Sequence, residues 1–139
     1  MVYIDSNIFI FALLADDQNA ARSRSLLNRI ATNEISASTS TLTWDEIVWS
    51  VRKFLGIEDA LLAGKKFLEF PFLTFLDVGE PILRKAQELM QRYRLKPRDA
   101  IHVAAALSRG IQEIISEDKD LDVVHELKRR GLRSASEKI

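Results

Sequence analysis

The chain has 139 residues, 47% of them hydrophobic and 29% charged, which predicts a single domain over residues 1–139 with a core of ordinary globular size. Its 20 basic residues balance 20 acidic ones, so bulk charge does not favour nucleic-acid binding, and the lack of cysteine excludes disulfides, thiolate metal sites and a thiol nucleophile. No apolar run approaches the roughly 20 residues that cross a membrane, and no signal peptide is recognisable, so we expect a cytoplasmic protein with no membrane association.

The first predicted elements are a strand and a helix separated by three polar residues. Residues 2–4 are β-branched or aromatic and predict a short buried strand, and residues 8–14 predict a buried helix. Ser6 or Asn7 can cap the start of that helix. Asp5 therefore lies between two segments that favour burial, where a charge is costly unless something compensates it.

The rest of the chain alternates helix patterns with short strand patterns. Helices are predicted over residues 20–31, 42–55, 58–70, 80–93 and 97–107. Strands are predicted over residues 34–38, 72–78 and 113–116, followed by a charged helix over residues 124–131 and an edge strand near Leu132. This alternation predicts an α/β fold, in which a small, mainly parallel β-sheet is sandwiched between α-helices.

The helix over residues 42–55 is predicted to be amphipathic. Its apolar stripe consists of Trp44, Ile47, Val48, Val51 and Leu55. Glu46, Trp49 and Lys53 lie on the opposite side. The Trp49 ring can stack on a nucleobase or contact a protein partner. Arg52, Lys53, Lys96 and Arg98 can contact phosphates, although scattered basic residues usually form a solvated face.

Four acidic residues are predicted to converge at one edge of the sheet. Asp5 and Asp118 follow strands, and Glu46 and Asp99 lie in the first turns of helices. Ligands of open parallel sheets bind beyond the carboxyl ends of the strands, which is the edge these positions share. Four carboxylates with no Lys or Arg between them repel one another unless they bind a hard cation such as Mg²⁺ or Mn²⁺.

Each of the four acids also has a purely structural interpretation. Asp5 and Asp118 can be helix caps. Glu46 can be a solvated charge on a helix face, and Asp99 can complement a helix dipole. These separate interpretations do not explain why four segments place an acid at the same edge.

Other polar residues lie beside the four acids. Ser6, Asn7 and Ser116 can orient the carboxylates or act only as caps, and Asp120 can be an outer ligand or face solvent. His102 is interpreted as a core or interface histidine, because a lone histidine lacks the partners that a zinc site needs.

Motifs of several enzyme classes are missing. The sequence contains no P-loop, G-x-G-x-x-G, G-x-S-x-G or H-E-x-x-H motif. Nucleotide hydrolysis, dinucleotide redox chemistry, serine hydrolysis and zinc proteolysis therefore lose support. A phosphatase with Asp5 as nucleophile is a weaker interpretation, because such enzymes usually carry a second Asp two residues later, where this chain has Asn7.

The order of these motifs resembles the PIN domain family. The motifs are Ile4-Asp5-Ser6-Asn7, a helix with Glu46, the run Arg98-Asp99-Ala100-Ile101-His102-Val103-Ala104-Ala105-Ala106, and Ile115-Ser116-Glu117-Asp118-Lys119-Asp120-Leu121. Within this family, the length and the compact end are similar to VapC-type toxins of toxin–antitoxin pairs. The chain departs from the family where residues 124–130 look helical instead of forming a final strand, and where Leu121 replaces a common aromatic.

The resemblance implies a three-layer α/β/α fold and a Mg²⁺- or Mn²⁺-dependent endoribonuclease. It implies that the catalytic and metal-binding acids are Asp5, Glu46, Asp99 and Asp118, and that the family's hydroxyl residues correspond to Ser6 and Ser116. A cognate antitoxin and a homodimer are also implied, and candidate dimer contacts are Trp49, Phe54 and residues 58–70. The alternative is a PIN-like module that binds RNA or protein without cleavage, although such a module has no need of four mutually repelling carboxylates.

Overall fold

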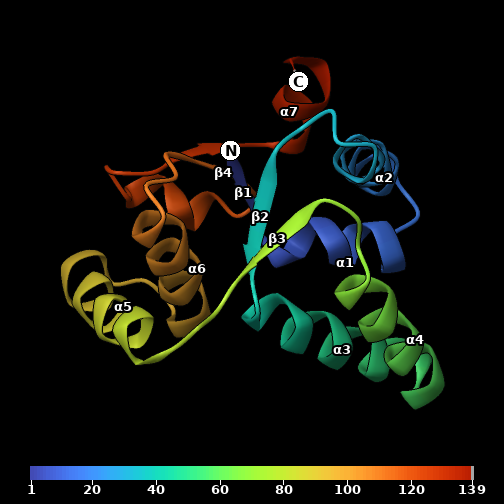
Figure 1. Cartoon of the computed structure of the whole chain (residues 1–139), viewed down its shortest axis with the longest axis horizontal. Helices are drawn as coiled ribbons and strands as arrows, with labels where there is room; N and C mark the ends of the chain where they lie inside the picture. Colours follow the sequence, from blue (N-terminus) through green and yellow to red (C-terminus); the bar gives the residue numbers. More distant parts are fainter. Residues whose placement is uncertain (139) are drawn as a thin grey trace.

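A central sheet organises the protein, whose computed structural model describes residues 1–138 (Figure 1). Its five short strands are β1 (Val2–Ile4), β2 (Ala37–Ser40), β3 (Leu73–Leu76), β4 (Glu113–Ile115) and β5 (Lys128–Arg130). They lie in the order β3-β2-β1-β4-β5, and every neighbouring pair is parallel. The prediction of a small, mainly parallel sheet is confirmed.

Helices connect the strands, as parallel pairing requires. The α-helices are α1 (Ser6–Leu14), α2 (Gln18–Ala31), α3 (Leu42–Leu55), α4 (Ile57–Leu68), α5 (Glu80–Tyr93), α6 (Pro97–Ser108) and α7 (Leu132–Lys138), and a 3₁₀ helix, η1, covers Lys119–Val123. No helix within residues 1–138 is both long enough and apolar enough to cross a membrane.

The two faces of the sheet bury separate apolar clusters. Ile4 and Ile115 belong to the cluster formed with α1, α2, α3, α4 and α7. Tyr3 and Ile114 belong to the other cluster, formed with α5 and α6. Neighbouring residues of a strand point to opposite faces, so each short strand supplies both clusters. Figure 1 shows α5 and α6 on one side of the sheet and α1 to α4 on the other, which is the predicted three-layer fold.

The second strand lies later in the chain than predicted. Strand β2 covers Ala37–Ser40 instead of residues 34–38, and it pairs with both β1 and β3. Ser38, Thr39 and Ser40 are all fully buried. Small hydroxyl residues fit the crowded centre of a sheet, but they carry little of the apolar pattern that predicts a strand.

The predicted C-terminal elements are wrong in both places. Residues predicted as a charged helix contain β5, which pairs with β4 at the edge of the sheet. The edge strand predicted near Leu132 is instead helix α7, whose Leu132 and Ala135 pack into the core. Backbone pairing with β4 decides the first case, and burial of two apolar residues three positions apart decides the second.

Candidate metal centre

The four predicted acids lie at the carboxyl ends of the strands. Asp5 follows β1, Glu46 is in the second turn of α3, Asp99 is in the first turn of α6, and Asp118 follows β4. A cleft of about 610 Å³ opens at this edge, lined by Glu46, Lys96, Pro97, Arg98, Asp99 and Asp118. The structure therefore brings three of the acids to one cleft, with Asp5 buried next to them.

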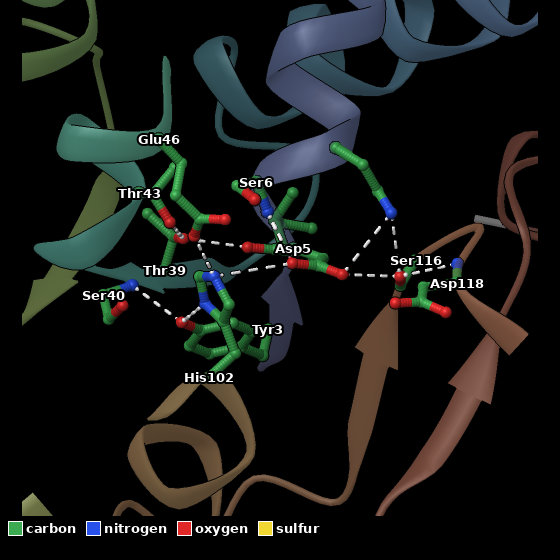
Figure 2. Close-up of polar contacts among 12 residues, drawn as sticks. Tyr3, Asp5, Ser6, Thr39, Ser40, Thr43, Glu46, His102, Ser116 and Asp118 are labelled. Atoms are coloured by element: carbon green, nitrogen blue, oxygen red, sulfur yellow. Dashed lines mark hydrogen bonds and ion pairs between the residues drawn. The ribbon is translucent and has the colours of Figure 1, made fainter. Parts of the chain in front are cut away.

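Asp5 is fixed by several hydrogen bonds. It is 4% exposed and caps α1, accepting a hydrogen bond at Oδ1 from the Ser6 backbone N–H at 2.8 Å. The Ser116 hydroxyl donates to Oδ2 at 2.6 Å, and Asn7 Nδ2 lies 3.5 Å from the same oxygen (Figure 2). Of the three residues that the sequence offers as caps of this helix, Asp5 is the one that caps it, and Ser6 and Asn7 do not.

Ser116 links Asp5 to Asp118. Its hydroxyl oxygen accepts from Asn7 Nδ2 at 3.1 Å and from the Asp118 backbone N–H at 3.0 Å. Asp118 in turn caps η1, accepting from the Asp120 backbone N–H at 3.0 Å. Asn7 and Ser116 therefore contact the acids through their side chains, while Ser6 contacts Asp5 through its backbone.

Glu46 is bound by a histidine that the sequence analysis placed in the core. His102 is 1% exposed, and its Nε2 lies 2.5 Å from Glu46 Oε1 and 3.6 Å from Asp5 Oδ1. Its Nδ1 lies 2.6 Å from the Tyr3 hydroxyl, which accepts a hydrogen bond from the Ser40 backbone N–H at 3.0 Å (Figure 2). The histidine is buried, but it contacts two of the proposed ligands, so its interpretation as a residue of the core alone is incomplete.

Two effects on the charge of His102 oppose each other. Burial lowers its pKa, because an imidazolium loses solvation there. The Tyr3 oxygen and the carboxylates of Glu46 and Asp5 outweigh this effect, and they raise the pKa of His102 well above its ordinary value. Compensation of Asp5 by a basic side chain was not expected from the sequence, and His102 supplies part of it.

Asp99, Asp118 and Asp120 form the more open part of the site. Carboxylate oxygens of these three residues all lie within 4.8 Å of one another, close enough to hold one cation. Burial raises the pKa of Asp99 to about 6, with further contributions from the charges of Asp118 and Asp5. Asp120 is exposed and lies within this group.

The predicted basic and aromatic contacts separate into two places. Lys96 and Arg98 line the cleft, whereas Trp49, Arg52 and Lys53 do not. Lys53 Nζ lies 5.1 Å from the centre of the Trp49 ring and 5.5 Å from that of Phe54, on the outer surface of α3. Only Lys96 and Arg98 are therefore placed to contact a molecule that binds in the acidic cleft.

The acidic set suits a hard divalent cation. Carboxylate oxygens are the ligands that Mg²⁺ and Mn²⁺ prefer. Within the part of the chain whose side chains are described, neither Asp99 nor Asp118 has an ion-pair partner, and Asp5 and Glu46 pair only with His102. Burial is the main cause of the raised pKa of Asp99, and the charges of Asp118 and Asp5 add to it. A cation bound here would favour the ionised carboxylate.

Tyr3 was not among the residues singled out from the sequence, and His102 was interpreted only as a core or interface histidine. Two signals were available. Tyr3 precedes Asp5 by two positions, so both side chains share one side of β1. His102 follows Asp99 by three positions, so both share one side of α6.

Comparisons with known proteins agree with this geometry. A model of the PIN domain family matches residues 2–127. No curated protein sequence matches the chain. Among solved structures, VapC20 of Mycobacterium tuberculosis, a toxin that cleaves the sarcin-ricin loop, superposes with a TM-score of 0.75 at 16% identity, covering 92% of this chain and 98% of that one.

Two solved toxin–antitoxin assemblies are also similar in fold. VapBC2 of Rickettsia felis, bound to a promoter DNA fragment, gives a TM-score of 0.73 at 16% identity over 94% of this chain and 98% of that one. DNA-bound VapBC of Salmonella typhimurium gives 0.72 at 18% identity over 94% and 97%. Because the family match spans most of the sequence and the fold agrees with it, the chain belongs to the PIN domain family.

Proposed function

We propose that this single-domain protein is a Mg²⁺- or Mn²⁺-dependent endoribonuclease of the cytoplasm and the toxin of a toxin–antitoxin pair. The observation that carries the proposal is the convergence of Asp5, Glu46, Asp99 and Asp118 at one edge of the sheet. The family match and the similarity to VapC folds support it.

Each part of the site has a role in this proposal. The four acids hold the cation, and Asp120 adds an outer carboxylate. Asn7, Ser116 and the Ser6 backbone fix Asp5 in place. The chemistry that the bound cation supplies is activation of a water molecule and offset of negative charge on the scissile phosphodiester. Lys96 and Arg98, which line the cleft, contact the neighbouring phosphates of the RNA.

A cleavage assay tests the activity. Purified protein is incubated with defined RNAs, one of them a sarcin-ricin loop hairpin, in Mg²⁺, in Mn²⁺ and in EDTA. We expect cleavage only with a divalent cation, because without one the acidic cleft repels the RNA backbone.

Matched variants of α1 control the assay. Asp5→Asn removes a charge before the helix begins, and Asp16→Asn removes an exposed charge beyond its end. Asp5→Asn should abolish cleavage, and Asp16→Asn should cleave at the parent rate. If Asp5→Asn folds and still cleaves at the parent rate, the assignment of the site is wrong.

An apolar outer surface supports the proposal of protein partners. Between about half and two thirds of each side chain is exposed at Trp49, Phe54, Leu55, Leu61, Leu62 and Leu68 of α3 and α4. Exposed apolar patches of this kind usually mark interaction surfaces. We assign this surface to a second copy of the chain, and the acidic cleft to the proposed antitoxin.

Two measurements test these partners. Light scattering at micromolar concentration should report a dimer, and a monomer would count against one. A short adjacent reading frame encoding a DNA-binding domain with a disordered tail would identify the antitoxin, whose co-expressed product should copurify and suppress RNA cleavage.

The same apolar surface favours the alternative of a binding module without catalysis. Calorimetry distinguishes the two functions. Heat and thermal stabilisation on addition of Mn²⁺ support the nuclease, whereas neither is expected from a protein that only binds RNA or another protein.

A further inference from the structure

A buried chain of hydrogen bonds ends on one of the proposed ligands. It begins at the Ser40 backbone N–H, which donates to the Tyr3 hydroxyl at 3.0 Å. It continues from that hydroxyl to His102 Nδ1 at 2.6 Å, and from His102 Nε2 to Glu46 Oε1 at 2.5 Å (Figure 2). Strand β2, strand β1, helix α6 and helix α3 each supply one member.

The direction of this chain follows from donor and acceptor chemistry. The backbone N–H of Ser40 can only donate, and the Glu46 carboxylate can only accept. Between them, the Tyr3 hydroxyl accepts from Ser40 and can donate to Nδ1, which leaves the proton of neutral His102 on Nε2. Nε2 also carries a proton in the imidazolium, so His102 donates to Glu46 in either charge state.

Glu46 depends on this contact for its position. Among the described side chains, His102 is the only hydrogen-bond partner of the Glu46 carboxylate, and it binds Oε1. A glutamate has three rotatable side-chain bonds, so without this contact its carboxylate would sample several positions. The other oxygen, Oε2, has no protein partner in the described part of the chain and remains available to a cation.

We propose that His102 is a positioning residue that holds Glu46 for the divalent cation, with Tyr3 fixing the orientation of the imidazole ring. This inference rests on the proposed metal-dependent function. Groups that hydrogen-bond to metal ligands orient them, and their loss typically weakens metal binding by about 10- to 100-fold. A residue needed only to fill the core would be replaceable by an apolar side chain of similar size.

The test compares two substitutions of His102 by Mn²⁺ binding. His102→Leu fills the space without a donor, and His102→Gln keeps an N–H donor near the position of Nε2. Free Mn²⁺ is measured by electron paramagnetic resonance, and the melting temperature without metal is recorded for each variant. His125→Gln, at an exposed position, is the matched control.

The expected result is a split between the two variants. His102→Leu should bind Mn²⁺ about 10- to 100-fold more weakly than the parent, His102→Gln should recover most of that loss, and His125→Gln should match the parent. Equal Mn²⁺ affinity of the Leu variant and the parent overturns the proposal, and so does a Gln variant as weak as the Leu variant.

Tyr3→Phe keeps the proposal testable if His102→Leu does not fold. It removes the hydroxyl beside Nδ1 and retains the ring, so a loss of Mn²⁺ affinity is expected and parent affinity would overturn the proposal. If the parent protein binds no Mn²⁺ at all, the metal-dependent function fails together with this inference. If the parent binds Mn²⁺ but the His102 variants do not differ from each other as expected, only the positioning role of His102 is wrong.

Discussion

The acidic site has two halves that are built differently. Asp5 and Glu46 form a fixed half, in which each carboxylate accepts a hydrogen bond of 2.6 Å or shorter from Ser116 or His102. Asp99 and Asp118 form an open half, in which the Asp99 carboxylate has no hydrogen-bond partner within the described side chains and is held at a raised pKa. The carboxylates of the fixed half have protein partners, whereas Asp99 in the open half is buried beside like charges.

The difference separates two contributions to metal binding. Preorganisation lowers the cost of arranging ligands, and uncompensated charge supplies attraction for the cation. Variants in either half should therefore weaken metal binding. In the metal-free protein, a variant of the open half should raise the stability, and a variant of the fixed half should lower it.

The largest effect is expected in the open half. Asp99→Asn removes a proposed ligand, so Mn²⁺ affinity should fall by more than about 100-fold, beyond the loss typical of outer partners. The melting temperature without metal should rise, because the charge buried at Asp99 and its repulsion by Asp118 and Asp5 are both removed. Calorimetry and thermal melting check both results, with Asp16→Asn as control. A lower metal-free melting temperature would contradict the comparison.

The fixed half should respond with the opposite sign in stability. Ser116→Ala removes the hydroxyl that donates to Asp5 and accepts from Asn7 and Asp118. Mn²⁺ affinity should fall by about 10- to 100-fold, and the free energy of unfolding should fall by about 1–3 kcal/mol, because buried partners lose their hydrogen bond. Chemical denaturation checks the second value. Unchanged stability would show that Ser116 does not hold Asp5.

Acidification should weaken metal binding through the open half. Because the pKa of Asp99 is raised to about 6, protons compete with the cation below that pH. Mn²⁺ affinity should be nearly constant above pH 7 and should fall by about tenfold between pH 6 and pH 5. Calorimetry at several pH values checks this. A Mn²⁺ affinity that does not change with pH would show that Asp99 is not a ligand.

The same raised pKa has a consequence for stability without metal. The folded state binds this proton more tightly than the unfolded state, whose Asp99 has its ordinary pKa near 3.8. The resulting stabilisation is complete below pH 3.8 and is lost as the pH rises through about 6. The difference in melting temperature between the parent and Asp99→Asn, measured across this pH range without metal, should report the stabilisation by the Asp99 proton.

The smallest effect is expected at Asp120. Its carboxylate lies within 4.8 Å of those of Asp99 and Asp118, but the side chain is exposed and solvent screens its charge. Asp120→Asn should weaken Mn²⁺ binding by about twofold to fivefold, the range of an exposed charge pair. A loss as large as that of Asp99→Asn would make Asp120 a direct ligand.

Local patterns were sufficient to predict most helices and the acidic edge. Asp5, Glu46, Asp99 and Asp118 were found because position after a strand or at a helix start is a property of the sequence. The His102 contact with Glu46 was missed because it depends on α3 and α6 meeting across the sheet, at a separation of 56 residues. No periodicity in either helix encodes that meeting.

The C-terminal strand β5 could not be predicted for a different reason, which is its composition. Lys128, Arg129 and Arg130 carry none of the apolar alternation that predicts a strand. They become β5 because β4 offers an unpaired backbone edge. Arg129 then donates to the Ser116 carbonyl at 3.0 Å and pairs with Asp122 at 2.7 Å, contacts that exist only after the strand is in place.

This basic strand also bears on whether the sheet can pair edge to edge with another sheet. β5 is the last strand of the sheet, so its outer backbone groups could pair with a strand of another molecule. Arg129 and Arg130 pair with Asp122 and Glu113, but Lys128 is exposed. It opposes such pairing, because a second copy would bring the same charge alongside. The basic composition that makes β5 hard to recognise in the sequence therefore also suits its place at one edge of the sheet.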